Sequence, residues 1–264
     1  MDIFAFVIEM LLIGIAVGLI SSVLGLGGGI VMVPAFVTFI AGMDGHTAKG
    51  TSLLVIVFVS ALNAWRQNRG YPIDWGLVIP LAAAAIIGGY AGGWLTARMP
   101  ERIVLLPFLL MMLITAAQTF LLKEIPVPDD PKPGRRSRAG GIGLLAGLVS
   151  GATGTGGGIV MVPLSLMAGF VTNARVTALS NLVMVPMSIA GTAAHVMAPK
   201  TTDLAWTTGQ VTWSLLPLVF LGAVVSSYWG RRLNTVLPLH YRRVLLGTLL
   251  IVIIIRIAWR VISP

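Results

Sequence analysis

The sequence predicts an all-α integral membrane protein with two inverted repeats, each formed by a glycine-broken re-entrant helix pair and three transmembrane helices. Three observations lead to this fold class: an extreme apolar composition, six uninterrupted apolar segments, and a glycine-rich stretch that occurs twice. Of the 264 residues, 56% are hydrophobic and 10% are charged, and the mean hydropathy is +0.93. Soluble domains carry roughly 25% charged residues, so the composition makes the lipid bilayer the expected surroundings of this chain.

Six apolar segments are long enough to cross a bilayer, which takes about 20 residues in a helix. They cover residues 47–66, 74–97, 103–122, 176–197, 206–230 and 241–262. A hydrophilic stretch from Lys123 to Arg138 contains four prolines and eight charged residues, which indicates a loop outside the membrane. The chain therefore divides into a first membrane repeat at 1–122, a linker at 123–139 and a second membrane repeat at 140–264.

Two further apolar segments, 4–41 and 140–170, are interrupted by clusters of glycine. Residues 18–34 read GLISSVLGLGGGIVMVP and residues 147–163 read GLVSGATGTGGGIVMVP, with twelve of seventeen positions identical at a constant offset of 129. Chance similarity between apolar segments would not match so many positions without a gap. The match therefore indicates an internal duplication.

The distribution of Lys and Arg favours a re-entrant path for both broken segments. If both segments crossed the bilayer, the eighteen basic residues would divide ten against eight between the two faces. If both turn back, the basic residues divide twelve against six, and the positive-inside rule makes the richer face, with the linker, cytoplasmic. Each repeat then crosses three times, so the second repeat is inverted, as in many secondary transporters. An alternative stays open for the first broken segment, because residues 3–24 are long enough to cross alone.

The glycine clusters are the first candidates for ligand binding. Glycine adopts backbone conformations closed to other residues, and each cluster leads into a short helix whose N-terminus carries unpaired N–H donors and a partial positive charge. Two such N-termini that face each other inside the membrane would form an anion site. The alternative is that the glycines only permit close helix packing. The clusters consist of Gly25, Gly27, Gly28 and Gly29 in the first repeat and Gly154, Gly156, Gly157 and Gly158 in the second.

Hydroxyl and amide side chains near the glycines are the second group of candidates. A hydroxyl can donate to an oxyanion without bringing a charge into the membrane, or it can bond the carbonyl one helical turn earlier. Ser52 and Asn181 occupy equivalent positions after the two broken segments, and we expect both to line the site. Asn63 and Thr192 form a second equivalent pair, which interhelical hydrogen bonds would explain equally well. The hydroxyl candidates beside the glycines are Ser21, Ser22, Ser150, Thr153 and Thr155.

Few ionisable side chains lie within the apolar segments. His195 is a possible proton relay, because imidazole ordinarily titrates near neutrality, or it lies at a helix end in the headgroup region. Lys49 and Arg175 lie where the first full crossing of each half begins, and we expect them to anchor helix ends, with attraction of anions as the alternative. Without cysteine or a cluster of acidic groups in the spans, the sequence predicts no enzyme, no cofactor and no metal site. The scattered basic residues also argue against nucleic acid as a partner.

The doubled motif, GLGGGIVMVP and GTGGGIVMVP, resembles the sulfite exporter TauE/SafE family of membrane permeases, and the resemblance covers essentially the whole chain. It implies a multi-pass protein of the cell inner membrane that transports small sulfur-containing or organic anions, typically out of the cell. We therefore expect a secondary transporter that exports sulfite, a related sulfur oxyanion or an organosulfonate by alternating access. The glycine clusters and their adjacent hydroxyls would hold the anion. A passive anion channel, or a permease for another small organic anion, is the alternative.

Overall fold

The chain forms a bundle of long and short α-helices with one small β-hairpin. The computed structural model describes residues 3–24, 27–67, 69, 73–100, 110, 113, 136–236, 248, 251 and 255. The helices are α1 (Ile3–Leu24), α2 (Gly29–Phe39), α3 (Gly45–Gln67), α4 (Trp75–Thr96), α6 (Arg136–Thr153), α7 (Gly158–Met167), α8 (Asn173–Val196) and α9 (Leu216–Val236). The antiparallel hairpin consists of β1 (Thr207–Thr208) and β2 (Val211–Thr212), and a short 3-10 helix, η2 (Trp213–Leu215), leads from it into α9.

The predicted crossings that fall on described residues are helical. Helices α3, α4 and α8 match three of them within a few residues, whereas most of 103–122 and 241–262 lies outside the described residues. The prediction for 206–230 is wrong at its start, because Gly209 turns the chain with a φ of 58° and residues 207–212 pair as a hairpin. Among the described residues, five helical segments are long and apolar enough to span a bilayer, in α1, α3, α4, α8 and α9. The chain is therefore a multi-pass membrane protein.

Glycine interrupts the helix between α1 and α2 and again between α6 and α7. We call residues 25–28 the first glycine loop and residues 154–157 the second. The N-caps of the two short helices, Gly28 and Gly157, adopt nearly the same left-handed conformation, with φ of 74° and 71°. A Cβ on Gly28 would lie 2.6 Å from Cγ1 of Val17, and a Cβ on Gly157 would lie 2.6 Å from the carbonyl oxygen of Ala146. Because Val17 and Ala146 are also 129 residues apart, both short helices fold back onto equivalent positions of the preceding helix.

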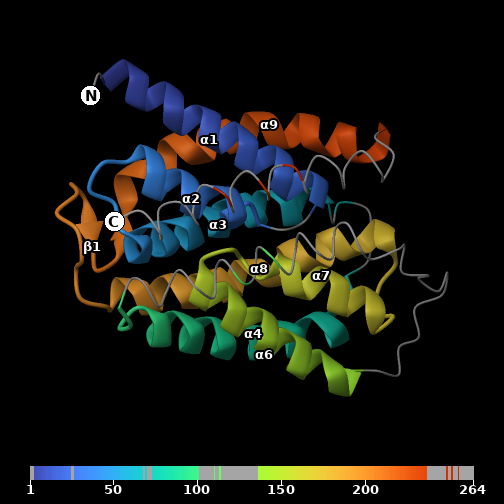
Figure 1. The fold of residues 1–264 in the computed structure, drawn as a ribbon. Coiled ribbons are helices and arrows are strands. Elements are labelled where there is room, and N and C mark those ends of the chain that lie inside the picture. The colour runs from blue at the N-terminus through green and yellow to red at the C-terminus, as the bar shows by residue number, and fades with distance from the viewer. Residues whose placement is uncertain are drawn as a thin grey trace.

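Helices from the two halves of the chain alternate across the bundle (Figure 1). Helices α3 and α8 pack against each other at its centre, α1 pairs with α9 on one side, and α4 pairs with α6 on the other. Gly50 and Gln67, near the two ends of α3, approach His195 and Asn181 of α8, respectively, so the two central helices are antiparallel. Each half of the chain therefore packs its helices mainly on the other half.

Small residues let the paired helices approach closely. Gly143, Gly147 and Gly151 lie four residues apart on α6, and a Cβ on each would lie 2.1–2.3 Å from a carbonyl oxygen of α4. Gly14 and Gly18 occupy the equivalent positions on α1, where a Cβ would lie 2.2 and 2.4 Å from carbonyl oxygens of α9. Membrane helices use such rows of small residues because van der Waals packing, rather than exclusion of water, holds them together.

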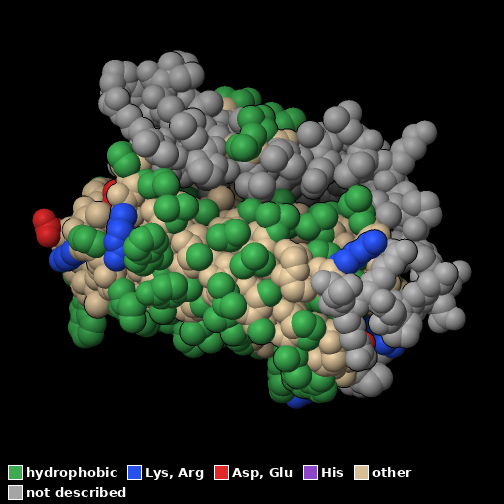
Figure 2. All heavy atoms as spheres, turned by 90° about the horizontal axis from the view of Figure 1, so that it is seen from below, with side chains coloured by type: hydrophobic (Ala, Val, Ile, Leu, Met, Phe, Trp, Pro, Cys, Tyr) green, Lys and Arg blue, Asp and Glu red, His purple; other side chains and the backbone are tan. Residues whose placement is uncertain are grey.

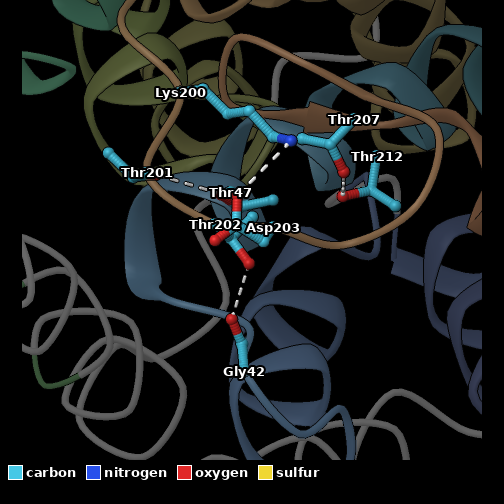
Figure 3. Close-up of polar contacts among 8 residues, drawn as sticks. All are labelled: Gly42, Thr47, Lys200, Thr201, Thr202, Asp203, Thr207 and Thr212. Atoms are coloured by element: carbon cyan, nitrogen blue, oxygen red, sulfur yellow. Dashed lines mark hydrogen bonds and ion pairs between the residues drawn. The ribbon is translucent and has the colours of Figure 1, made fainter.

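The chain between α8 and the hairpin closes one end of the bundle against the loop that joins α2 to α3 (Figure 3). The Thr202 hydroxyl donates to the Gly42 carbonyl at 2.7 Å, and the hydroxyls of Thr47 and Thr201 lie 3.2 Å apart. These contacts join segments that are more than 150 positions apart in the chain. This connecting segment thus ties the second half of the chain to the α2–α3 loop and the start of α3.

The outer surface suits contact with lipid. Figure 2 shows hydrophobic side chains over the middle of one face and charged side chains mainly toward its two ends. The exposed side chains of the long helices include large apolar residues, among them Ile79, Ile87 and Leu221. A soluble monomer does not expose apolar surface on this scale.

We expect that Gly147→Leu destabilises the fold, because its side chain would collide with the carbonyl oxygen of Ala85 on α4. Overpacking of this kind costs about 1–3 kcal/mol, so the thermal midpoint of the detergent-purified protein should fall. Gly141→Leu is the matched control on the same helix, since a Cβ there meets no atom within 4 Å. Equal midpoints for the two variants would contradict the packing described above.

Candidate functional site

The two glycine loops lie against each other inside the bundle. A Cβ on Gly27 would lie 3.0 Å from the carbonyl oxygen of Thr155. A Cβ on Gly29, the first residue of α2, would lie 2.3 Å from the carbonyl oxygen of Gly154. Such an approach of two backbones leaves no room for a side chain. The structure thus brings the two predicted clusters together, apart from Gly25, which lies outside the described residues.

This contact lies midway along the two central helices. Ile56, the twelfth of the 23 residues of α3, places Cδ1 3.0 Å from the Cβ position of Gly29 and 3.1 Å from that of Gly156. Met184, the twelfth of the 24 residues of α8, places Sδ 3.2 Å from the Cβ position of Gly27. Because α3 and α8 are both long enough to span a bilayer, the glycine loops lie at about half the depth of the spanning helices.

Both short helices begin without a side-chain cap. Gly28 precedes α2 and Gly157 precedes α7, and neither helix start receives a hydrogen bond from a capping side chain. The first turn of a helix carries N–H groups without intrahelical partners and a partial positive charge. Each of these starts can therefore donate hydrogen bonds to an anion.

Four polar side chains surround the second glycine loop, and three of them are engaged within the protein. The Ser52 hydroxyl, from α3, donates to the Gly154 carbonyl at 2.8 Å. The Thr153 hydroxyl donates one helical turn back at 2.6 Å and lies 2.8 Å from the hydroxyl of Thr155. Ser150 is fully buried, and its hydroxyl has no hydrogen-bond partner in the part of the chain that the structure describes. Ser150 is thus the predicted hydroxyl at this loop that stays available to a ligand.

The predicted residues near the first glycine loop bond mainly to protein. Ser22 donates to a carbonyl one helical turn back at 2.6 Å, and the Ser21 hydroxyl accepts a hydrogen bond from Nδ2 of Asn63 at 3.0 Å. Nδ2 of Asn181 donates to Oε1 of Gln67 at 3.1 Å, at the end of α3, while its buried Oδ1 has no partner among the described residues. The hydrogen bonds of Asn181 thus go to α3 and to its own helix, and not to the described part of the first loop.

His195 is completely buried, unlike a side chain exposed among lipid headgroups. Its Nδ1 lies 2.8 Å from Oε1 of Gln210, in the turn of the hairpin, and its Nε2 lies 3.5 Å from the carbonyl oxygen of Gly151 on α6. Gln210 in turn donates to the Ala97 carbonyl, after α4, at 2.8 Å. From α8, His195 therefore links the hairpin to α6, and Gln210 links the hairpin to the end of α4. The sequence did not predict this structural role. The proposed part of His195 as a proton relay stays a prediction.

Lys49 lies beside the second glycine loop, and its burial is unlike that of a side chain that anchors a helix end at the membrane surface. Its side chain is 0% exposed, and its Nζ donates to the Ala152 carbonyl at the end of α6, at 3.0 Å. A Cβ on Gly154 would lie 2.8–3.1 Å from carbon atoms of Lys49, so the lysine stem packs directly on the second glycine loop. Arg175, in contrast, is exposed. The position of Lys49 inside the apolar segment 47–66 was the sequence signal of this burial.

Comparison with known proteins places the chain among membrane proteins of similar length. A probable membrane transporter protein of Methanocaldococcus jannaschii is 26% identical over 250 residues, which cover 91% of each chain. Probable membrane transporter proteins of Bacillus subtilis and Haemophilus influenzae are also 26% identical, over 88% and 94% of this chain and 90% and 94% of their own. No solved structure matches the chain. The sequence profile of one family matches residues 10–257, and the protein therefore belongs to the sulfite exporter TauE/SafE family.

Proposed function

We propose that this protein is a secondary transporter that exports a small anion across the cell inner membrane by alternating access. The anion is sulfite, a related sulfur oxyanion or an organosulfonate. The observation that carries the proposal is the contact between the two glycine loops, where the uncapped starts of α2 and α7 lie midway along the spanning helices. Many secondary transporters bind anionic groups at half-helix N-termini near the bilayer midplane. Membership of a sulfite exporter family supports sulfite as the first substrate to test.

The donors at this site suit an oxyanion. Backbone N–H groups at the starts of α2 and α7 and the hydroxyl of Ser150 are neutral donors, and each can bond one oxygen of the ligand. An ion transferred from water must have its lost hydration replaced by such hydrogen bonds. Hydrogen bonds to a charged acceptor are shorter and stronger than those between neutral groups. The site can therefore bind an anion that has three exposed oxygens.

The close contact of the loops supports a carrier over an open channel. A Cβ on Gly27 would lie 3.0 Å from the carbonyl oxygen of Thr155, so the described parts of the two loops lie directly against each other in this conformation. A carrier passes through closed states as its halves move relative to each other, whereas a passive channel keeps a continuous path while it conducts.

We further propose that both broken segments are re-entrant and that the second repeat is inverted relative to the first. The equivalent contacts of Gly28 with Val17 and of Gly157 with Ala146 support a common folding-back in the two repeats. The pairing of α1 with α9 and of α6 with α4 supports two-fold pseudo-symmetry. In Figure 1 the start of α1 and the α2–α3 loop lie at one end of the bundle, and the start of α6 and the α7–α8 loop lie at the other.

The first test is release of sulfite from proteoliposomes that contain the purified protein, with and without a pH gradient or a membrane potential. We expect saturable release from the wild-type protein. Gly157→Leu should abolish it, because the new side chain would collide with the Ala146 carbonyl and would have to adopt a φ of 71°. Gly28→Leu should do the same at the first loop, where φ is 74°.

Gly169→Leu is the matched control, because Gly169 has a φ of 66° but no atom within 4 Å of its Cβ position. Gly169→Leu imposes the same kind of backbone strain at a position outside the two glycine loops, so this variant should keep the sulfite flux of the wild-type protein. Sulfite flux retained in both correctly inserted loop variants would refute the proposed site. Sulfite flux that saturates and is driven by a pH gradient or a membrane potential identifies a carrier. Sulfite flux that does not saturate and is not driven by either gradient identifies a channel.

The topology can be tested by cysteine labelling in intact cells, since the natural chain contains no cysteine. We expect a thiol reagent that cannot cross the membrane to label Gly42→Cys from outside the cell. An N-terminal tag should be accessible to its own probe from the same side. Arg138→Cys and Arg175→Cys should react only after the membrane is opened. A tag accessible only from the cytoplasm would show that the first broken segment crosses the bilayer.

A further inference from the structure

We propose that the transported anion binds at the second glycine loop, where the Lys49 ammonium group and the hydroxyls of Ser150 and Thr192 donate hydrogen bonds to it. The inference rests on the proposed transport function and adds the residues that determine affinity for the anion. It also makes the two repeats unequal, because the equivalent groups near the first loop are bonded within the protein or absent.

Lys49 is a buried lysine whose ammonium group has donors beyond the one that the Ala152 carbonyl accepts. The hydrogen bond from Nζ to the Ala152 carbonyl engages one of the three donors of its ammonium group. Asp44 acts on Lys49 electrostatically without forming an ion pair with it among the described residues. Oδ1 of Asp44 accepts the backbone N–H of Thr47 at 3.0 Å. The C-terminal end of α6 offers only about half a negative charge. An anion at this position would complete the neutralisation of the lysine.

Two buried hydroxyls of the second repeat lack the hydrogen bond that their counterparts form in the first. Ser21 and Asn63 are bonded at 3.0 Å, and the residues at the same positions 129 further on are Ser150 and Thr192. The side chain of threonine is shorter than that of asparagine and has no amide group that could reach the serine hydroxyl on the neighbouring helix. Accordingly, neither Oγ of Ser150 nor Oγ1 of Thr192 has a hydrogen-bond partner in the described structure.

These groups lie around the last turns of α6. Ser150 and Ala152, whose carbonyl receives the lysine bond, lie on either side of Gly151. Thr192 follows Gly191, and a Cβ on Gly191 would lie 3.6 Å from Cα of Gly151. The lysine donor from α3, the serine hydroxyl from α6 and the threonine hydroxyl from α8 therefore belong to one buried region beside the second glycine loop.

The charge at position 49 is not a packing requirement of the repeat. The residue 129 positions further on is Ala178, so the equivalent turn of α8 forms without a cation. The competing explanation is that Lys49 only caps the carbonyl groups at the end of α6, as lysines near helix C-termini do. Capping predicts a change in stability without a change in affinity for the anion, which makes the two roles separable.

The test compares KM for sulfite in proteoliposomes between the wild-type protein, Lys49→Gln and Lys49→Arg. We expect KM to rise about tenfold or more in Lys49→Gln, the factor that loss of a charge-assisted hydrogen bond implies. Lys49→Arg keeps the charge and should restore most of the affinity. Lys200→Gln is the control for removal of a positive charge, because Lys200 is exposed and pairs with Asp203 at the surface.

A second pair of variants tests the hydroxyls without removing a charge. Thr192→Asn copies the first repeat, so its amide should engage Ser150 and raise KM for sulfite without lowering the thermal midpoint. Asn63→Thr removes the hydrogen bond from Asn63 to Ser21 near the first loop and should leave KM for sulfite unchanged. The two variants exchange the same two residue types in opposite directions and leave the number of charged residues unchanged.

The outcomes separate this inference from the proposed function. If the wild-type protein transports sulfite and both Lys49→Gln and Thr192→Asn keep its KM, the anion does not bind beside the second loop, although transport stands. A lower thermal midpoint of Lys49→Gln with unchanged KM would show that Lys49 only caps α6. If the wild-type protein moves no small anion, the proposed function and this inference both fail.

Discussion

The structure depends on how the backbone N–H and C=O groups at two helix interruptions are accommodated inside a membrane. In the hydrocarbon core every backbone N–H and C=O needs a partner, and a chain break is tolerated only where protein or a polar cavity surrounds it. Here each glycine loop covers the other, and Ile56 and Met184 of the central helices close the sides. Among the described residues, the starts of α2 and α7 have no side-chain cap, and the first N–H groups of a helix lack intrahelical partners. The burial that makes the breaks possible thus also concentrates donors for an anion.

Close packing of the outer helices is the second condition. The long helices must approach one another closely enough to enclose the loops, and lipid supplies no hydrophobic force for that approach. The glycine rows of α6 and α1 let carbonyl oxygens of α4 and α9 lie almost in contact with the facing backbone. Glycine thus has one role along the long helices, where it permits close packing, and a further role at the breaks, where Gly28 and Gly157 adopt left-handed conformations.

Duplication preserved the backbone but not the side chains around it. Gly28 and Gly157 share one conformation and one packing contact, whereas Lys49 corresponds to an alanine and Asn63 to a threonine. The backbone is constrained because both loops must fit the same contact. The side chains beside it face no such shared constraint, so one loop could acquire a cation and free hydroxyls while the other closed its hydrogen bonds internally.

The sequence by itself determined the membrane class, the helices α3, α4 and α8 and the two breaks, because apolar length and clustered glycine act within a single segment of chain. It also indicated the duplication and the family. Only the tertiary structure decided that residues 207–212 form a hairpin, that His195 bonds Gln210, and that Lys49 is buried against α6. The lysine contact joins residues 103 positions apart. Burial of this kind depends on which helix lies opposite, and no local pattern in the chain records its neighbour.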